Sequence, residues 1–97
     1  MTIEFDGNDK SYLSWLLANP KGYVINRRRG KSDTYAVLHR ATCRMIRTYT
    51  EMARSGGFTE RKYIKACSPN IEPLKSYVRK MGRPDSSFSG KCKLCNP

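Results

Sequence analysis

Acidic residues and histidine are scarce in this 97-residue chain, which has 8 Asp and Glu residues and a single His. The longest apolar run, Trp15 to Ala18, is far shorter than the ~20 residues of a membrane-spanning helix. No charged and then apolar segment of the signal-peptide kind opens the chain, so a cytoplasmic location is expected. The sparse, separated acidic residues also argue against a nuclease, which gathers carboxylates around its metal ions.

Basic residues are abundant by contrast, since 19 Lys and Arg residues give a formal net charge of +11 at pH 7. The charge is uneven, because residues 1–20 carry Glu4, Asp6 and Asp9 against Lys10 alone. A basic body of this density favours a polyanionic partner, above all nucleic acid, although the same charge also serves solubility. We therefore expect the chain to bind nucleic acid.

The length fits one domain over residues 1–97, with a helical segment at 1–20 and a core at 21–97. A chain this short buries a modest apolar core, which a metal ion or disulfides would reinforce. It has four cysteines. Two disulfides suit a secreted protein, whereas without a signal peptide the same number favours a metal site or free thiols.

Local patterns predict a small α+β domain with a short antiparallel sheet, an N-terminal helix and a C-terminal helix. Capping residues at 6–9 precede helical periodicity over Tyr12–Leu17, which Asn19 and Pro20 end. Strand-like stretches lie at 23–26, 34–38 and 61–66, the first two forming a hairpin across a basic turn. Ser68 and Pro69 predict the N-cap and first residue of a helix that Gly82 ends.

Two short motifs predict a bound Zn²⁺ ion. His39 and Cys43 stand four positions apart, and Cys92 and Cys95 form a CxxC knuckle near the C-terminal end. Structural zinc takes four such ligands, usually as two sequence-local pairs. The ordinary alternatives are a hydrogen-bonding His, thiols that act as small hydrophobes, and a redox CxxC pair. Cys67 is expected to be a core thiol, and it is the replacement ligand if His39 is not one.

The motifs HRATC (39–43) and GKCKLCNP (90–97) resemble the metal-binding domain of Ada-type DNA alkylation-repair proteins. That domain has a CxxxC pair after a strand, then a strand, a helix ending in Gly, and a CxxC followed by Pro. The resemblance covers about residues 23–97 and implies this fold and a bound zinc. Two departures stand out: the 48 residues between Cys43 and Cys92 exceed the family pattern, and His39 replaces a Cys that accepts a methyl group. An imidazole is not the thiolate nucleophile that methyl transfer needs, so the departure argues against that activity.

The leading hypothesis is a zinc-stabilised module that binds duplex DNA through its phosphates, as an accessory or regulatory part of a DNA-processing system. The expected contacts come from the basic turn and from cations around the metal, namely Arg27, Arg28, Arg29, Lys31, Arg40, Arg44, Lys91 and Lys93. Tyr23, Tyr35 and Tyr63 have two readings, as stacking faces for bases or as sheet-packing residues.

The alternative hypothesis is a regulatory module that docks on a larger protein through the helix around Tyr12–Leu17. An enzymatic function is disfavoured, because the only His is assigned to zinc and four protein ligands leave the metal no open position for water.

We also expect that the chain has no membrane partner.

Overall fold

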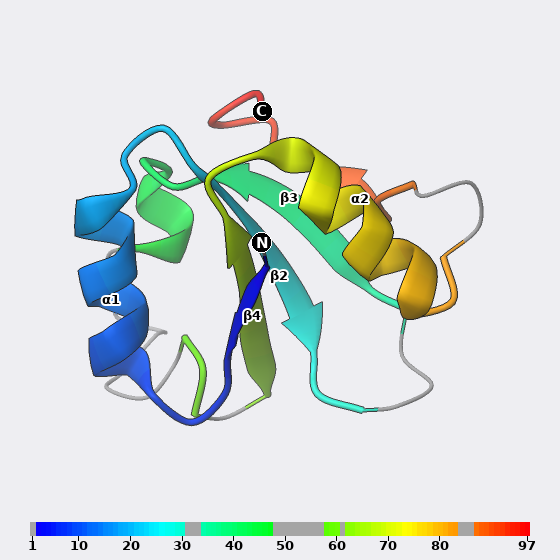
Figure 1. Ribbon diagram of the computed structural model, residues 1–97, viewed down its shortest axis with the longest axis horizontal. Coiled ribbons are helices and arrows are strands. Elements are labelled where there is room, and N and C mark those ends of the chain that lie inside the picture. The colour runs from blue at the N-terminus through cyan, green and yellow to red at the C-terminus, as the bar shows by residue number, and fades with distance from the viewer. Residues whose placement is uncertain (1, 31–33, 48–57, 61, 84–86) are drawn as a thin grey trace.

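The computed structural model describes residues 2–30, 34–47, 58–60, 62–83 and 87–97. In this part of the chain, a five-stranded sheet with the order β1-β4-β2-β3-β5 carries two α-helices (Figure 1). The elements are β1 (Ile3–Phe5), α1 (Asp9–Ala18), β2 (Tyr23–Arg28), β3 (Ala36–Arg40), the 3₁₀ helix η1 (Arg44–Ile46), β4 (Tyr63–Ser68), α2 (Ile71–Lys80) and β5 (Gly90–Lys91). The predicted small α+β class is confirmed. Neither described helix is long and apolar enough to cross a bilayer.

The sheet is mixed, so the prediction of a short antiparallel sheet holds for four of its strands and is wrong for the fifth. The β2–β3 hairpin is present, and β4 pairs antiparallel with both β2 and β1. The departure comes from β5, which pairs parallel with β3 through Val37–Gly90 and Leu38–Lys91. The chain leaves the sheet through α2 and returns along the free edge of β3, and this return carries the C-terminal residues to the end of β3 (Figure 1).

The N-terminal segment is part of the sheet rather than a helix alone. β1 lies at the sheet edge and precedes α1, whose N-cap Asn8 accepts a hydrogen bond from Ser11 N at 3.0 Å. The Asp9 carboxylate is buried and accepts hydrogen bonds from Thr59 N at 2.7 Å and Thr59 Oγ1 at 2.6 Å. The predicted capping cluster is therefore confirmed, and the helix ends before Asn19 as expected.

Apolar side chains fill both faces of the sheet, because successive residues of a strand point to opposite faces. On one face, Tyr12 and Leu16 of α1 pack against Val24 of β2. On the other face, α2 packs against Ile25 of β2. The second cluster consists of Ile25, Ala36, Leu38, Ala66, Leu74 and Val78. Each large side chain in these clusters contributes roughly 1.5–3 kcal/mol of burial free energy.

The start of α2 differs from the prediction. Ser68 is the last residue of β4, and its Oγ accepts a hydrogen bond from Asn70 N at 3.2 Å. Asn70 is the N-cap and Ile71 the first helical residue, so Ser68 and Pro69 do not begin the helix. The end of α2 is as predicted, because Gly82 has φ of +104°, a left-handed conformation that glycine adopts without strain.

Candidate metal centre

His39 enters the site from β3. It pairs with Val24 across the β2–β3 hairpin, and Val24 in turn pairs with Cys67 of β4. All three side chains therefore share the face of the sheet that α1 covers. His39 is at the β5 side of this row and is only 6% exposed. His39 and Arg40 belong to the strand, and the turn that carries Cys43 begins after them.

Cys43 is positioned by the turn that follows β3. Its backbone N–H donates to Arg40 O at 3.0 Å, and its carbonyl accepts from Ile46 N at 3.2 Å as η1 begins. Ala41 and Ile46 on either side are buried in the cluster around Tyr12, and the Tyr12 hydroxyl donates to Ile46 O. These contacts fix the turn, so the Cys43 thiol is held toward His39 by backbone geometry and by core packing.

The CxxC motif is delivered by β5. Ser89 N donates to Ala36 O and Cys92 N donates to Leu38 O, each at 2.9 Å, which extends the parallel pairing to the first thiol. The chain then turns sharply, since Asn96 N donates to Cys92 O at 3.0 Å and Asn96 has φ of +47°. Asparagine tolerates this left-handed conformation better than most residues. The turn places the second thiol, that of Cys95, above the end of β3.

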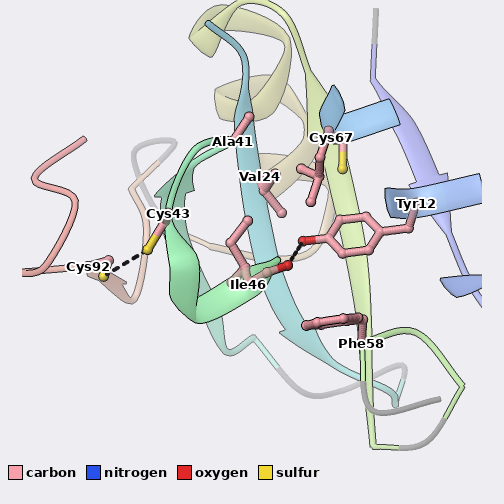
Figure 2. Packing of buried hydrophobic residues seen from close by; sticks show 9 residues of the cluster. Tyr12, Val24, Ala41, Cys43, Ile46, Phe58, Cys67 and Cys92 are labelled. Carbon is pink, nitrogen blue, oxygen red and sulfur yellow. Dashed lines mark hydrogen bonds between the residues drawn. The ribbon is translucent and has the colours of Figure 1, made fainter. Parts of the chain in front are cut away.

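The structure brings the four predicted ligands together. The nearest ligand atoms of His39, Cys43, Cys92 and Cys95 all lie within 4.8 Å of one another. The Cys43 and Cys92 sulfurs are 3.8 Å apart and point toward each other in Figure 2. A disulfide requires ~2.05 Å, and all four cysteines are free. Two sulfurs bound tetrahedrally at ~2.3 Å to one zinc ion lie ~3.8 Å apart, so the spacing fits a metal-bound pair.

The His39 ring is in the state that binds metals. Burial, with a further contribution from the Lys65 ammonium, lowers its pKa to about 4, so the imidazole is neutral at pH 7. Its Nδ1 atom is buried, and no described atom hydrogen-bonds it. A buried nitrogen without a partner costs free energy, and coordination to a metal ion would satisfy it.

The pKa values of Cys43 and Cys92 are shifted in opposite directions. Burial raises the pKa of Cys43 to about 12, in spite of a hydrogen bond from the Met45 backbone. Burial also raises the pKa of Cys92, but hydrogen bonds from the Cys95 and Leu94 backbones and from the Cys43 and Cys95 thiols together more than offset it, so this pKa is lowered overall. Without a cation the cluster favours thiols over several adjacent thiolates. A bound metal ion would offset both the burial and the repulsion between them.

Arg40 ties the C-terminal turn to β3, a role that sequence reasoning missed. Its backbone N–H donates to Cys95 Sγ at 3.2 Å. Its guanidinium donates from Nε to Cys95 O and from Nη2 to Asn96 O, both at 3.0 Å. Partners that hydrogen-bond metal ligands in this way orient them and tune their affinity. Arg40 was predicted to contact nucleic acid, and here it holds the knuckle.

Cys67 lies apart from the cluster. It is fully buried in the core, near Tyr12, on the opposite side of Val24 from Cys43 (Figure 2). The burial raises the pKa of its thiol, which keeps it protonated and neutral. The interpretation of Cys67 as a core thiol therefore agrees with its position.

The predicted cations form two separate groups. Arg44, Lys91 and Lys93 are exposed around the cluster. Arg27, Arg28 and Arg29 lie at the other end of the hairpin, three to five residues from Val24, the partner of His39, which is about 10–17 Å along the strand. Of these, Arg27 donates to Tyr77 Oη at 2.8 Å, and Arg29 pairs with Asp6. Lys31 lies outside the described residues.

A shallow hollow of about 330 Å³ opens beside the cluster, lined by Thr42, Cys43, Arg44, Leu94 and Cys95. Two of its lining residues, Cys43 and Cys95, belong to the cluster.

Comparison of the chain with protein-family models, with curated proteins and with solved structures finds no match. The resemblance to Ada-type domains therefore stays a prediction, and the function has to be argued from the geometry of the site.

Proposed function

We propose that this chain is a zinc-stabilised module that binds duplex DNA through its phosphates and serves a DNA-processing system as an accessory or regulatory part. The observation that carries the proposal is the gathering of His39, Cys43, Cys92 and Cys95 within 4.8 Å in a chain of net charge +11.

Zinc is the metal that this donor set favours. Three thiolates and a neutral imidazole are soft to intermediate ligands, and the pattern Cys₃His is common in tetrahedral structural zinc sites. Four protein ligands close the coordination sphere, so no water is activated and the role is structural rather than catalytic. The metal would join β3 to the C-terminal turn, which otherwise depends on β5 and the hydrogen bonds of Arg40.

The same ligands would order the cations around them. Arg44 directly follows Cys43, and Lys93 stands between the two cysteines of the knuckle. Both side chains are exposed, as is Lys91 of β5. A fixed cluster of positive charges contacts DNA phosphates and sets affinity and register more than sequence choice. Removal of the metal should therefore weaken DNA binding through disorder of these cations.

Titration of a fluorescent duplex at several salt concentrations tests the DNA part of the proposal. Affinity should fall as salt rises, and Arg44→Gln should lower the slope of log K against log salt by about 1. Lys10→Gln, the matched control, removes the same charge from an exposed site on α1 and should leave the slope unchanged. Absence of binding at low salt, or equal effects of the two variants, contradicts the proposal.

Native mass spectrometry with and without a chelator tests the metal part. One zinc ion per chain is expected, lost on chelation or in Cys92→Ala. A metal-free chain that keeps its fold and its DNA affinity contradicts a structural role for zinc.

A docking module for a larger protein is the second candidate, and the exposed Leu17 of α1 favours it, with 73% of its surface accessible. Trp15 gives less support than its position in the sequence suggested. It is half-buried, and a Cβ at Gly22 would lie 2.8 Å from its Cη2 atom. A pull-down with and without nuclease treatment separates the two candidate functions. A partner protein retained through DNA is lost after digestion. A partner bound directly by α1 is kept after digestion and is lost in Leu17→Ser.

A further inference from the structure

Two tyrosines and an arginine form a row across three strands at the hairpin end of the sheet. Arg28 of β2 pairs with Tyr63 of β4. On the other side, Arg27 pairs with Ala36, which places Tyr35, the residue before β3, beside Arg28. Strand alternation puts all three on the face that carries Val24 and Cys67 farther along.

The three side chains lie against one another. The Arg28 guanidinium carbon is 4.4 Å from the centroid of the Tyr35 ring. The Tyr35 and Tyr63 centroids are 6.2 Å apart, with the rings tilted by 50°. Arg28 is exposed, and each tyrosine is half-buried. We call these residues the Tyr35–Arg28–Tyr63 platform.

The platform lies outside the two buried apolar clusters, although the buried Lys65 ammonium lies 5.6 Å from the centroid of the Tyr63 ring. Among the described residues, neither Tyr35 nor Tyr63 belongs to, or packs against, the two buried apolar clusters. Tyr23 differs, because it packs against the cluster beneath α2 and so serves the sheet. Of the three tyrosines predicted as stacking faces, Tyr35 and Tyr63 thus lie outside the two clusters.

The surroundings of the platform are positive. Lys62, the residue before Tyr63, is exposed, and Arg29 N donates to Lys62 O at 2.9 Å. Arg29 is partly neutralised by Asp6. Flat aromatic and guanidinium surfaces beside cations suit unpaired nucleotides, whose bases stack and whose phosphates meet the charges. Paired bases in a duplex do not expose these faces.

We propose that the Tyr35–Arg28–Tyr63 platform binds single-stranded nucleic acid by stacking of one or two unpaired bases. The proposal rests on nucleic acid as the partner, but it adds a second site, about 13 Å along β2 from the residue that pairs with His39, and a second kind of contact. The module would then hold duplex phosphates near the zinc and an unpaired strand at the hairpin end.

The test compares a fluorescent oligothymidylate of ~12 nucleotides with an abasic strand of the same length and charge. The zinc-loaded wild-type chain should bind the base-carrying strand more tightly, by roughly 5- to 100-fold. Tyr35→Leu should remove most of this preference, and Tyr35→Phe should retain it. Unchanged zinc content in Tyr35→Leu shows that the fold is kept, and Tyr63→Leu gives a second, independent variant.

Equal affinity of the wild-type chain for the two strands overturns the platform and leaves phosphate binding intact. A preference for bases that survives both Tyr35→Leu and Tyr63→Leu also overturns it. Failure to bind either strand, or duplex DNA, at low salt refutes the platform together with the proposed function.

Discussion

Replacement of Cys92 by Ala should destabilise the chain only when zinc is present. Cys92 joins β5 to the cluster, and its sulfur is 3.8 Å from that of Cys43. The matched control is Cys67→Ala, which removes a fully buried thiol outside the cluster. Both variants lose one sulfur from the same side of the sheet, but only Cys92→Ala loses a proposed metal ligand.

The expected magnitude follows from mass action. Free zinc at ~1,000 times its Kd stabilises the folded chain by about 4 kcal/mol. Loss of a group that only hydrogen-bonds a metal ligand weakens metal affinity by up to roughly 100-fold. Loss of a ligand itself should weaken zinc affinity by at least as much. At the same concentration of free zinc, zinc then stabilises the folded Cys92→Ala variant by about 1.4 kcal/mol or less. The variant therefore loses about 3–4 kcal/mol of stability relative to the wild type. Cys67→Ala should cost about 1 kcal/mol through lost packing.

Thermal unfolding of the wild type and both variants, each with buffered zinc and with chelator, measures these differences. The loss in Cys92→Ala corresponds to a fall in Tm of roughly 10–30 °C with zinc. With chelator, its Tm should come close to that of the wild type. Cys67→Ala should show the same small fall in both conditions.

Two results would refute the reasoning. An equal effect of Cys92→Ala with and without chelator means that its sulfur matters for packing and not for a metal. A zinc-dependent effect of Cys67→Ala that matches that of Cys92→Ala means that the ligand set is wrong.

Three further predictions follow from particular contacts. Arg40→Lys removes the two guanidinium hydrogen bonds to the carbonyls of Cys95 and Asn96, so zinc affinity in a competition assay should fall about 10- to 100-fold. Unchanged zinc affinity would contradict the role of Arg40 in supporting the proposed ligands. Burial lowers the pKa of Lys65 from 10.5 to about 8, so the folded chain holds fewer protons than the unfolded chain between these values, and stability rises with pH there. Relative to Lys65→Met, the wild type should gain roughly 3 kcal/mol across that window in urea unfolding; a flat difference contradicts the burial. Calorimetry of zinc binding at pH 7 in buffers of different ionisation enthalpy should show proton release from thiols such as that of Cys43, with none from the neutral His39.

The metal cluster was predictable from sequence because its ligands come as two short pairs. The spacings of His39 with Cys43 and of Cys92 with Cys95 each constrain a turn, whatever the rest of the chain does. The support given by Arg40 was not predictable, because its partners are 55 and 56 residues away and follow from the parallel pairing of β5.

The edge strands explain the errors in the fold. β1 has three residues and β5 two, too few to show strand alternation. Ser68 and Pro69 carry strong signals for a helix start, yet Ser68 is held in β4 by pairing with Tyr23. Tertiary pairing thus moved the start of α2 to Ile71, while local signals such as Asn8 and Gly82 located the start of α1 and the end of α2 correctly.

X-ray absorption at the zinc edge of the zinc-loaded chain tests the central claim most directly. The proposed zinc site would be four-coordinate, with three sulfurs at ~2.3 Å and one nitrogen at ~2.0–2.1 Å. In His39→Ala the nitrogen contribution should disappear. Four sulfurs in the wild type, or a shell of oxygen ligands alone, would contradict a site made of His39, Cys43, Cys92 and Cys95.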